Sequence, residues 1–298
     1  SKAAPASLKK RLLADGSYEE LPQGTANNPN ACVFEKMIPG TEEALSPATR
    51  GRASCLLLNS YKENAHPLID VYEGKISLDE FTAQLDDDDL ILLLGGQPNT
   101  SVANTYGYGN LPEYGVPNIM TADGPAGLRI TPQCEVCTTA WPCATLLAST
   151  WNPALVERVG TAGAEEVKEN NIAVWLTPAV NIHRNPLCGR NFEYYSEDPY
   201  LAGTFAAKFV ERFTKKGIFA TIKHFAVNSQ ETNRSAENEV LSERALREIY
   251  LKVFEVAVKS GYVRAIMTSY NRINGISAAG SYDLTTSILR EEWGYDGM

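Results

Sequence analysis

Polar residues that could bind a ligand follow four short apolar stretches of the sequence. Asp123 follows the first stretch, whereas Lys223 and His224 end the third. Further candidates at or after these stretches are Arg129, His183, Arg190, Glu193, Met267, Tyr270 and Asn271. A carboxylate among several hydrogen-bond donors and an aromatic ring suits a ligand that is covered in hydroxyl groups.

The apolar stretches read as β-strands that alternate with amphipathic helices. We expect strands at residues 118–121 and from residues 172, 218 and 264 onward. Helices are expected to begin at Asn152, Asp198, Ser242 and Asp283, because these residue types favour helix N-termini. This alternation predicts an α/β fold in which helices cover both faces of a parallel sheet.

Long polar segments follow the strands, which favours a (β/α)8 TIM-type barrel. In such a barrel the loops at the carboxyl ends of the strands build the active site, so the polar strand ends would face one pocket. A doubly wound sheet also fits the alternation. However, "DGPAGLR" after the first strand does not match the glycine-rich phosphate loop of that fold.

Residues 1–70 carry no clear periodic pattern. This region is rich in turn-forming residues, and we interpret it as a linker or as part of another module. Two short helices are expected within residues 78–94. Ser77 can cap the first helix, and the acidic run from Asp86 to Asp89 suits the positive end of the second helix dipole.

Charge and composition argue against several kinds of partner. The formal net charge of −9 argues against nucleic acid, because phosphate binding needs a basic surface. No apolar stretch approaches the roughly 20 residues of a membrane-spanning helix, so no membrane partner is expected. The first residues lack a signal-peptide pattern, which leads us to expect a cytoplasmic location.

The six cysteines do not predict a disulfide framework in a chain of 298 residues. Cys134 and Cys137 have the spacing of a zinc or redox pair. However, no second pair of this kind follows, and the nearest histidine is His183. Free thiols are therefore the favoured interpretation, and we expect neither a metal ion nor an organic cofactor.

Each candidate residue also has a structural interpretation when it is taken alone. Arg190 and Glu193 could form an ordinary ion pair, and a histidine at a strand end could be a satisfied core residue. Lys223 could form a Schiff base, as in aldolases. The binding-site interpretation is favoured because four successive strand ends carry the same kind of polar residue, as in barrel enzymes.

Six segments of the sequence, taken in order, resemble one enzyme family. They are "TADGPAGLR", "WPCATLLASTWNP", "NIHRNPLCGRNFEYYSEDPYLAG", "IKHFAVNSQETNR", "SERALREIYLKVFE" and "IMTSYNRING". Together they are similar to the catalytic barrel of glycoside hydrolase family 3, and to its bacterial β-glucosidases in particular. The resemblance covers about residues 78–298 and implies that residues 71–298 form this barrel.

The resemblance implies that several residues bind the sugar on the cleaved side of the substrate. Asp123 would accept hydrogen bonds from the distal hydroxyl groups, and Arg129 would line the same pocket. The neighbouring hydroxyl groups would be held by Arg190, Lys223 and His224. In this assignment Lys223 and His224 bind sugar hydroxyl groups rather than shuttle a proton.

Met267 and Tyr270 would shape the wall of the pocket, with Tyr270 near the nucleophile. In the family, the nucleophilic aspartate ends a strand that follows the motif matched by "REEWGYDGM", so it is expected just after Met298. The general acid comes from an α/β sandwich domain. A retaining mechanism needs two carboxyl groups, and the resemblance therefore places no catalytic residue within the chain.

About five of the eight barrel strands fit before Met298, so we expect a barrel that lacks its last strands and stops before the nucleophile strand. Open strand edges favour aggregation or pairing. We therefore expect either a longer polypeptide with a sandwich domain or completion by a second chain, which includes a homo-oligomer. Glu193 and Glu197 could replace the nucleophile, but ion pairs with Arg190 are the favoured interpretation.

Two functions remain open from the sequence. The first is a β-glucosidase that hydrolyses terminal, non-reducing β-D-glucosyl residues of glucosides or oligosaccharides by a retaining double displacement. The second is a non-catalytic carbohydrate-binding fragment that needs the rest of the protein for activity.

Overall fold

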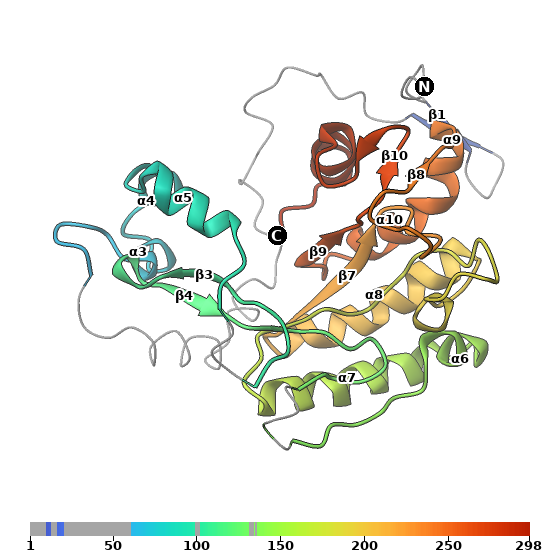
Figure 1. Ribbon diagram of the computed structural model, residues 1–298, viewed down its shortest axis with the longest axis horizontal. Helices are drawn as coiled ribbons and strands as arrows, with labels where there is room; N and C mark the ends of the chain where they lie inside the picture. Colours follow the sequence, from blue (N-terminus) through green and yellow to red (C-terminus); the bar gives the residue numbers. More distant parts are fainter. Residues whose placement is uncertain (1–9, 13–16, 21–60, 99–101, 131–133, 135) are drawn as a thin grey trace.

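The computed structural model describes residues 10–12, 17–20, 61–98, 102–130, 134 and 136–298 (Figure 1). Over these residues the chain forms an α/β fold around a four-stranded sheet of order β5-β6-β7-β9. The strands are Thr121–Ala122 (β5), Val174–Trp175 (β6), Phe219–Phe225 (β7) and Ala265–Thr268 (β9). Every neighbouring pair in this sheet is parallel, which confirms the predicted parallel sheet.

The described sheet has four strands, whereas the sequence pattern indicates about five. At the edge of the sheet, the backbone N–H of Ile266 donates to the carbonyl of Met298 at 2.9 Å. The N–H of Met298 in turn donates to the carbonyl of Arg264 at 3.0 Å. These two bonds follow the parallel pattern, but they involve a single residue and form no further strand.

Three helices pack against one face of the sheet. They are α7 (Pro153–Glu169), α8 (Pro199–Lys215) and α10 (Lys252–Val258). Figure 1 shows α7 and α8 lying along the same side of the sheet. The ring of Trp175 in β6 lies 5.5 Å from the ring of Phe213 in α8, so the core sits between this helix layer and the strands.

The opposite face of the sheet borders a hollow of about 460 Å³. Val174 and Thr221 line it from the strands, and Leu93 and Leu94 line it from the end of α5 (Asp87–Leu94). Successive strand residues point to opposite faces, so one short strand serves both the helix layer and the hollow. The expectation that helices cover both faces is therefore wrong for the described part of the chain.

Helix α7 can approach β6 closely because it presents a glycine to the sheet. A Cβ atom at Gly163 would lie 2.8 Å from the Trp175 ring, closer than carbon atoms tolerate. The start of this helix confirms the predicted cap, since Oδ1 of Asn152 accepts a hydrogen bond from the N–H of Leu155 at 3.1 Å. Pro153 occupies the first helical position, where its missing N–H is not needed.

The other predicted helix starts are also present. Asp198 caps α8 by accepting hydrogen bonds from two backbone N–H groups at 2.8 and 2.9 Å. Ser77 and Asp86 form capping boxes at the starts of α4 (Leu78–Ala83) and α5.

The two C-terminal helical segments differ from regular α-helices. The segment after Ser242 consists of α9 (Glu243–Ala245), a π-helical stretch (Leu246–Tyr250) and α10. The last one, Asp283–Glu292, is π-helical throughout. Helices are predicted at both places, and the hydrophobic period does not separate α-helices from π-helices well.

The strand predicted at residues 118–121 is instead two elements. Val116–Ile119 (β4) pairs antiparallel with Tyr108–Leu111 (β3), and only the following β5 joins the parallel sheet. Gly115, at φ 70°, allows the turn that closes this hairpin. The "YGNL" sequence of β3 lacks an apolar run, so the pattern gives no sign of the hairpin.

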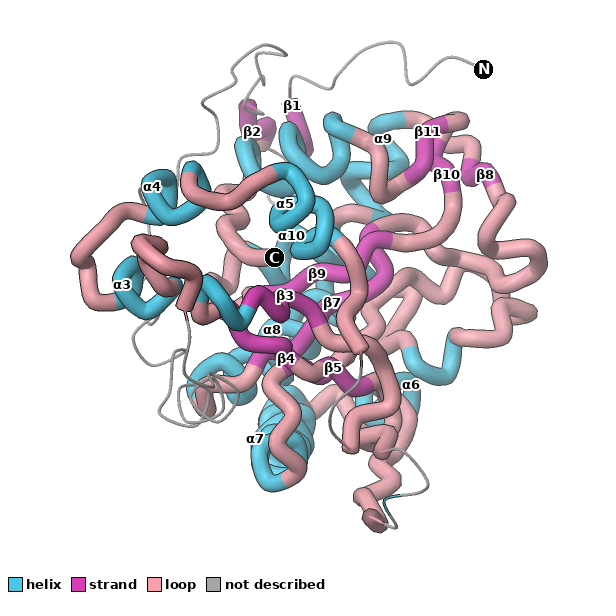
Figure 2. Tube along the Cα trace, turned by 60° about the vertical axis from the view of Figure 1, so that its left-hand side comes forward, coloured by secondary structure: helices cyan, strands magenta, loops and turns pink. Residues whose placement is uncertain are grey.

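The hairpin belongs to a small lobe at one side of the sheet (Figure 1). This lobe also contains α3 (Leu68–Tyr72), α4 and α5, and it buries Phe81, Leu111 and Tyr114 in a core of its own. Figure 2 shows β7 and β9 next to each other at the centre of the molecule, with α7 below them.

The described residues also contain helix α6 (Ala144–Ser149) and two small sheets. One has the order β11-β10-β8 and contains Ile276–Ser277, Arg272–Ile273 and Asn238–Glu239. The other pairs Lys10–Leu12 (β1) with Tyr18–Glu20 (β2). Most of the predicted linker or module at residues 1–70 lies outside the described residues. Within them, no helix has the length and apolar character needed to cross a membrane.

Candidate functional site

A buried ion pair joins the ends of β5 and β7. Nζ of Lys223 donates to Oδ1 of Asp123 at 2.6 Å, although the two residues lie 100 positions apart in the sequence. The Lys223 side chain is 2% exposed and that of Asp123 is 26% exposed. The other carboxylate oxygen of Asp123 accepts from Arg129 at 3.1 Å, and Arg129 lies at the surface. The first and third predicted strand ends therefore meet.

The backbone of Asp123 is fixed on both sides. Its N–H donates to Oδ1 of Asn104 at 2.9 Å, and its carbonyl accepts from Nε1 of Trp175 at 3.3 Å. Trp175 is buried between the sheet and the helices. The carboxylate thus projects from a rigid strand end, as a preorganised binding group should.

The ion pair with Lys223 keeps the side chain of Asp123 negatively charged. Burial acts to raise the pKa of this carboxyl group, but the charge and the hydrogen bond of Lys223 outweigh burial, so the pKa lies below its usual range. Burial lowers the pKa of the Lys223 ammonium group, and Asp123 offsets only part of that effect. Asp123 is therefore a carboxylate near neutral pH and can only accept hydrogen bonds.

His224, the next residue of β7, is held by its backbone. Its N–H donates to Oδ1 of Asn181 at 2.8 Å, and its carbonyl accepts from Nδ2 of the same side chain at 2.9 Å. Nδ1 of His224 lies 3.5 Å from the hydroxyl group of Tyr194. Burial lowers the pKa of His224 well below 6.5, and the charges of Arg190 and Lys223 lower it further. His224 is therefore neutral and offers one donor and one acceptor.

Arg190 enters the site from the long loop after β6. Its Nε donates to Oε1 of Glu193, a residue that is 3% exposed. Glu193 thus forms the structural ion pair that the sequence suggests for it. Glu197 does not, because its side chain is exposed and the described ion pairs of Arg190 involve Glu193 and Glu231.

The loop after β7 supplies a residue that the sequence analysis missed. Nη1 of Arg234 donates to Oε2 of Glu231 at 2.9 Å, and its guanidinium carbon lies 5.1 Å from the centre of the Tyr270 ring. Tyr270 follows β9 and is 63% exposed. Arg234 ends the same "KHFAVNSQETNR" segment as Lys223 and His224, but its spacing from them gives no sign of this contact.

Three other predicted site residues lie at different places around the site: Met267, Asn271 and His183. Met267 is half-buried and pairs in register with Lys223, so it lies at the same strand end. Asn271 is fully buried and donates to the carbonyl of Ala226 at 3.1 Å, which makes it a structural residue. Nε2 of His183 lies 2.8 Å from the carbonyl of Asn191 and supports the loop after β6.

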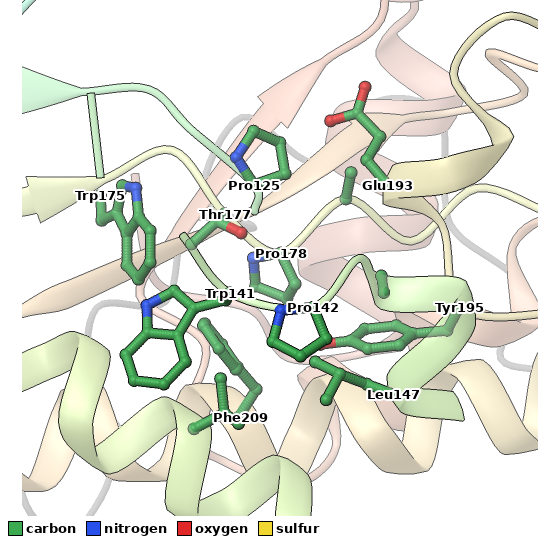
Figure 3. Close-up of a pocket in the computed structure, with 13 residues that line it drawn as sticks. Pro125, Trp141, Pro142, Leu147, Trp175, Thr177, Pro178, Glu193, Tyr195 and Phe209 are labelled. Atoms are coloured by element: carbon green, nitrogen blue, oxygen red, sulfur yellow. The ribbon is translucent and has the colours of Figure 1, made fainter. Parts of the chain in front are cut away.

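An enclosed pocket below this region is too small for a ligand (Figure 3). Figure 3 shows the rings of Trp141, Tyr195 and Phe209 around it, whereas the carboxylate of Glu193 points away from them. Its volume of about 10 Å³ leaves room for one water molecule.

A wider, polar hollow of about 470 Å³ lies between the loops after β6 and β7. It is lined by Asn185, Leu187, Cys188, Gly189, Gln230, Glu231 and Thr232. Its size falls in the range of small-ligand pockets.

The remaining cysteines and acidic residues give no sign of a metal site. Cys134 and Cys137 are exposed free thiols. Across the described residues, no three His, Cys, Asp or Glu side chains come together in a group that could hold a metal ion.

Charged and aromatic residues gathered at the carboxyl ends of parallel strands are typical of α/β enzymes whose active site lies at that edge. Comparison with known proteins identifies the group. Residues 108–298 match the glycosyl hydrolase family 3 N terminal domain. The chain therefore belongs to glycosyl hydrolase family 3, as the resemblance in the sequence indicates.

Three relatives illustrate the similarity. The chain is 52% identical over 304 residues to β-glucosidase A of Butyrivibrio fibrisolvens, covering 100% of this chain and 37% of that protein. It resembles the structure of a β-glucosidase from Paenibacillus barengoltzii with a TM-score of 0.76 and 42% identity, covering 100% of this chain and 32% of that one. For β-glucosidase 3B from Thermotoga neapolitana in complex with glucose, the TM-score is 0.69 and the identity 46%, with coverage of 74% and 33%. The chain thus spans about a third of the length of these relatives.

Proposed function

We propose that this chain supplies the sugar-binding part of a β-glucosidase that hydrolyses terminal β-D-glucosyl residues. The observation that carries the proposal is the Asp123–Lys223 pair at 2.6 Å, with Arg129 and His224 beside it at the same sheet edge. A carboxylate that accepts hydrogen bonds next to fixed donors can bind adjacent hydroxyl groups of one pyranose ring. The relatives' names, and the glucose bound to the Thermotoga enzyme, support glucose as the sugar.

Each residue has a role in this proposal. Asp123 accepts hydrogen bonds from two hydroxyl groups, and Lys223 and Arg190 donate to the neighbouring ones. His224 is neutral and can donate to one hydroxyl group without taking up a proton. Tyr270, held beside Arg234, forms the wall of the pocket.

We propose that the strands belong to a (β/α)8 barrel. The supporting observations are the parallel order β5-β6-β7-β9 and a helix layer on one face only. A doubly wound sheet would carry helices on both faces. Two further residues of the barrel end, Met267 and Arg129, then complete the ring of sugar-facing side chains.

We propose that hydrolysis is retaining and uses two carboxyl groups from outside residues 1–298, with an α/β sandwich domain of the same protein supplying the acid. A retaining enzyme needs two carboxyl groups about 5 Å apart. Asp123 is neutralised by Lys223 and Arg129, and Glu193 by Arg190. These ion pairs make both carboxylates poor nucleophiles. The share of the relatives' length that the chain spans leaves room for such a domain.

The test is hydrolysis of p-nitrophenyl β-D-glucoside by the protein that contains this chain. We expect turnover of the β-glucoside and not of the α-glucoside, with the β-anomer of glucose as the first product in an NMR time course. The β-xyloside serves as the matched substrate that lacks only the hydroxymethyl group. Glucose should also bind to the same protein in titration calorimetry, and Lys223→Met should abolish this binding.

The outcomes separate the two open functions. Glucose binding by the whole protein without turnover would identify a carbohydrate-binding protein instead of a hydrolase. Absence of both turnover and glucose binding would reject the proposed function.

A further inference from the structure

Glu231 contacts residues from several of the loops around the site. Its Oε2 accepts from Nη1 of Arg234 at 2.9 Å. Its Oε1 accepts from Nδ2 of Asn228 at 2.9 Å and lies 3.9 Å from Nε of Arg190. The Glu231 side chain is 21% exposed, so water screens these contacts only in part.

The partners of Glu231 lead to three different strand ends. Arg234 lies against the ring of Tyr270, which follows β9. Arg190 comes from the loop after β6. Asn228 donates to the hydroxyl group of Tyr194 at 2.8 Å, and that group lies 3.5 Å from Nδ1 of His224 in β7. One side chain thus connects the loops that surround the candidate pocket.

The contacts of Glu231 also show what it does not do. Both carboxylate oxygens already accept hydrogen bonds from protein groups and two arginines lie beside them, so Glu231 is a poor nucleophile. Arg190 and Arg234 carry like charges, and a carboxylate between them offsets their repulsion. Without it, the more exposed Arg234 is free to swing into water, since its side chain is 40% exposed against 18% for Arg190.

We propose that Glu231 is a positioning residue that holds Arg190 and Arg234 in place around the sugar pocket before substrate arrives. This inference rests on the proposed β-glucosidase function. Fixing flexible arginine side chains in advance removes the entropy that substrate binding would otherwise have to overcome. Glu231 therefore acts on substrate affinity through the arginines rather than by touching the sugar.

The first test is Glu231→Gln, which keeps the shape of the side chain and removes its charge. We expect KM for p-nitrophenyl β-D-glucoside to rise about tenfold, the effect of losing one charge-assisted hydrogen bond, while kcat changes less than about threefold. Glu231→Asp, too short to reach both arginines, should act in the same direction. The matched control is Glu211→Gln, because Glu211 accepts from Lys215 at 2.7 Å on the surface of α8. It should leave KM unchanged.

A double-mutant cycle separates positioning from general support of the fold. If Glu231 acts through Arg234, Glu231→Gln should raise KM less than about twofold further in a protein that already carries Arg234→Leu. An undiminished tenfold rise both in that background and in a protein that carries Arg190→Leu would overturn the proposal. So would an unchanged KM in the single variant.

Crystal structures of the wild-type and Glu231→Gln proteins give a readout that does not need activity. We expect Arg234 to leave the Tyr270 ring in the variant, and an unmoved Arg234 would contradict the positioning role. Failure of the proposed function shows up differently, as a wild-type protein that neither turns over β-glucosides nor binds glucose. Even then, the position of Arg234 in the two crystal structures would show whether Glu231 holds it in place.

Discussion

The candidate pocket has a strand half and a loop half, and the two are held together differently. The strand half consists of Asp123, Lys223 and His224, which sit at the ends of β5 and β7 and are fixed by backbone hydrogen bonds. The loop half consists of Arg190, Glu231, Arg234 and Tyr270, which contact one another mainly through side chains.

The two halves of the pocket differ in how deeply their side chains are buried. The Lys223 side chain is 2% exposed, and the neighbouring Asp123 carboxylate balances its charge at 2.6 Å. In the loop half Tyr270 is 63% exposed, and its contact with Arg234 lies at the surface. Substitutions in the strand half should therefore affect stability and activity together, whereas those in the loop half should mainly affect substrate affinity.

The largest effect is expected from Asp123→Ala. This change leaves the buried Lys223 charge without its partner, and the free energy of unfolding in urea should fall by about 3–5 kcal/mol. Because burial already lowers the pKa of Lys223, the loss should shrink as the pH rises and the amine gives up its proton. The control Glu211→Ala breaks a pair with the exposed Lys215 and should cost less than about 1 kcal/mol. Equal small losses in both variants would mean that the pair does not support the fold.

His224→Ala should lower kcat/KM for the β-glucoside about 10- to 100-fold, the effect of an unmade hydrogen bond to the sugar of about 1–3 kcal/mol. Steady-state kinetics would measure it. His66→Ala is the matched control, because His66 is an exposed histidine that contacts Asp70 far from the site. Unchanged kinetics in His224→Ala would remove this residue from the sugar-binding group.

The pH dependence of stability should also report on His224. Its folded-state pKa is well below 6.5, so below pH 6.5 the unfolded chain binds a proton that the folded protein does not. Stability should therefore fall as the pH drops below 6.5, by up to about 1.4 kcal/mol per pH unit. His224→Gln should remove this part of the slope in urea titrations at pH 5.5 and 6.5. The same slope in both proteins would show that His224 accepts a proton in the folded state.

The smallest effect is expected in the loop half, from Tyr270→Leu. The loss of an exposed cation–π contact of about 0.5–1 kcal/mol should raise KM about two- to fivefold and leave the melting temperature nearly unchanged. Tyr262→Leu removes a similar contact, in which Lys215 lies 5.4 Å from the ring centre, and should not change KM. An effect of Tyr270→Leu as large as that of His224→Ala would contradict the division into two halves.

Sequence patterns predicted the strand half better than the loop half. Lys223 and His224 end an apolar run, and a strand end has few possible positions in a parallel sheet, so their meeting with Asp123 could be expected. Arg234 lies eleven residues beyond Lys223 in a polar loop, and nothing in the spacing indicates that this loop folds back onto Tyr270. Contacts of that kind depend on tertiary geometry that periodicity does not encode.

The same contrast holds for the fold. The caps at Asn152 and Asp198 were predictable, because a side chain three residues or fewer from its partner needs no tertiary information. The β3–β4 hairpin and the uncovered sheet face were not, since both depend on which segments pack together. Apolar content alone does not distinguish a strand face that meets helices from one that lines a hollow.

Trp175 gives the molecule a built-in optical reporter. Its indole N–H holds the carbonyl of Asp123 and its ring rests on Phe213, so a ligand that pulls on the Asp123 carboxylate also disturbs a tryptophan shielded from water. Trp151, at 74% exposed, emits at longer wavelengths. Sugar binding should therefore change the short-wavelength part of the emission spectrum, and occupancy could be followed without a label or a chromogenic substrate.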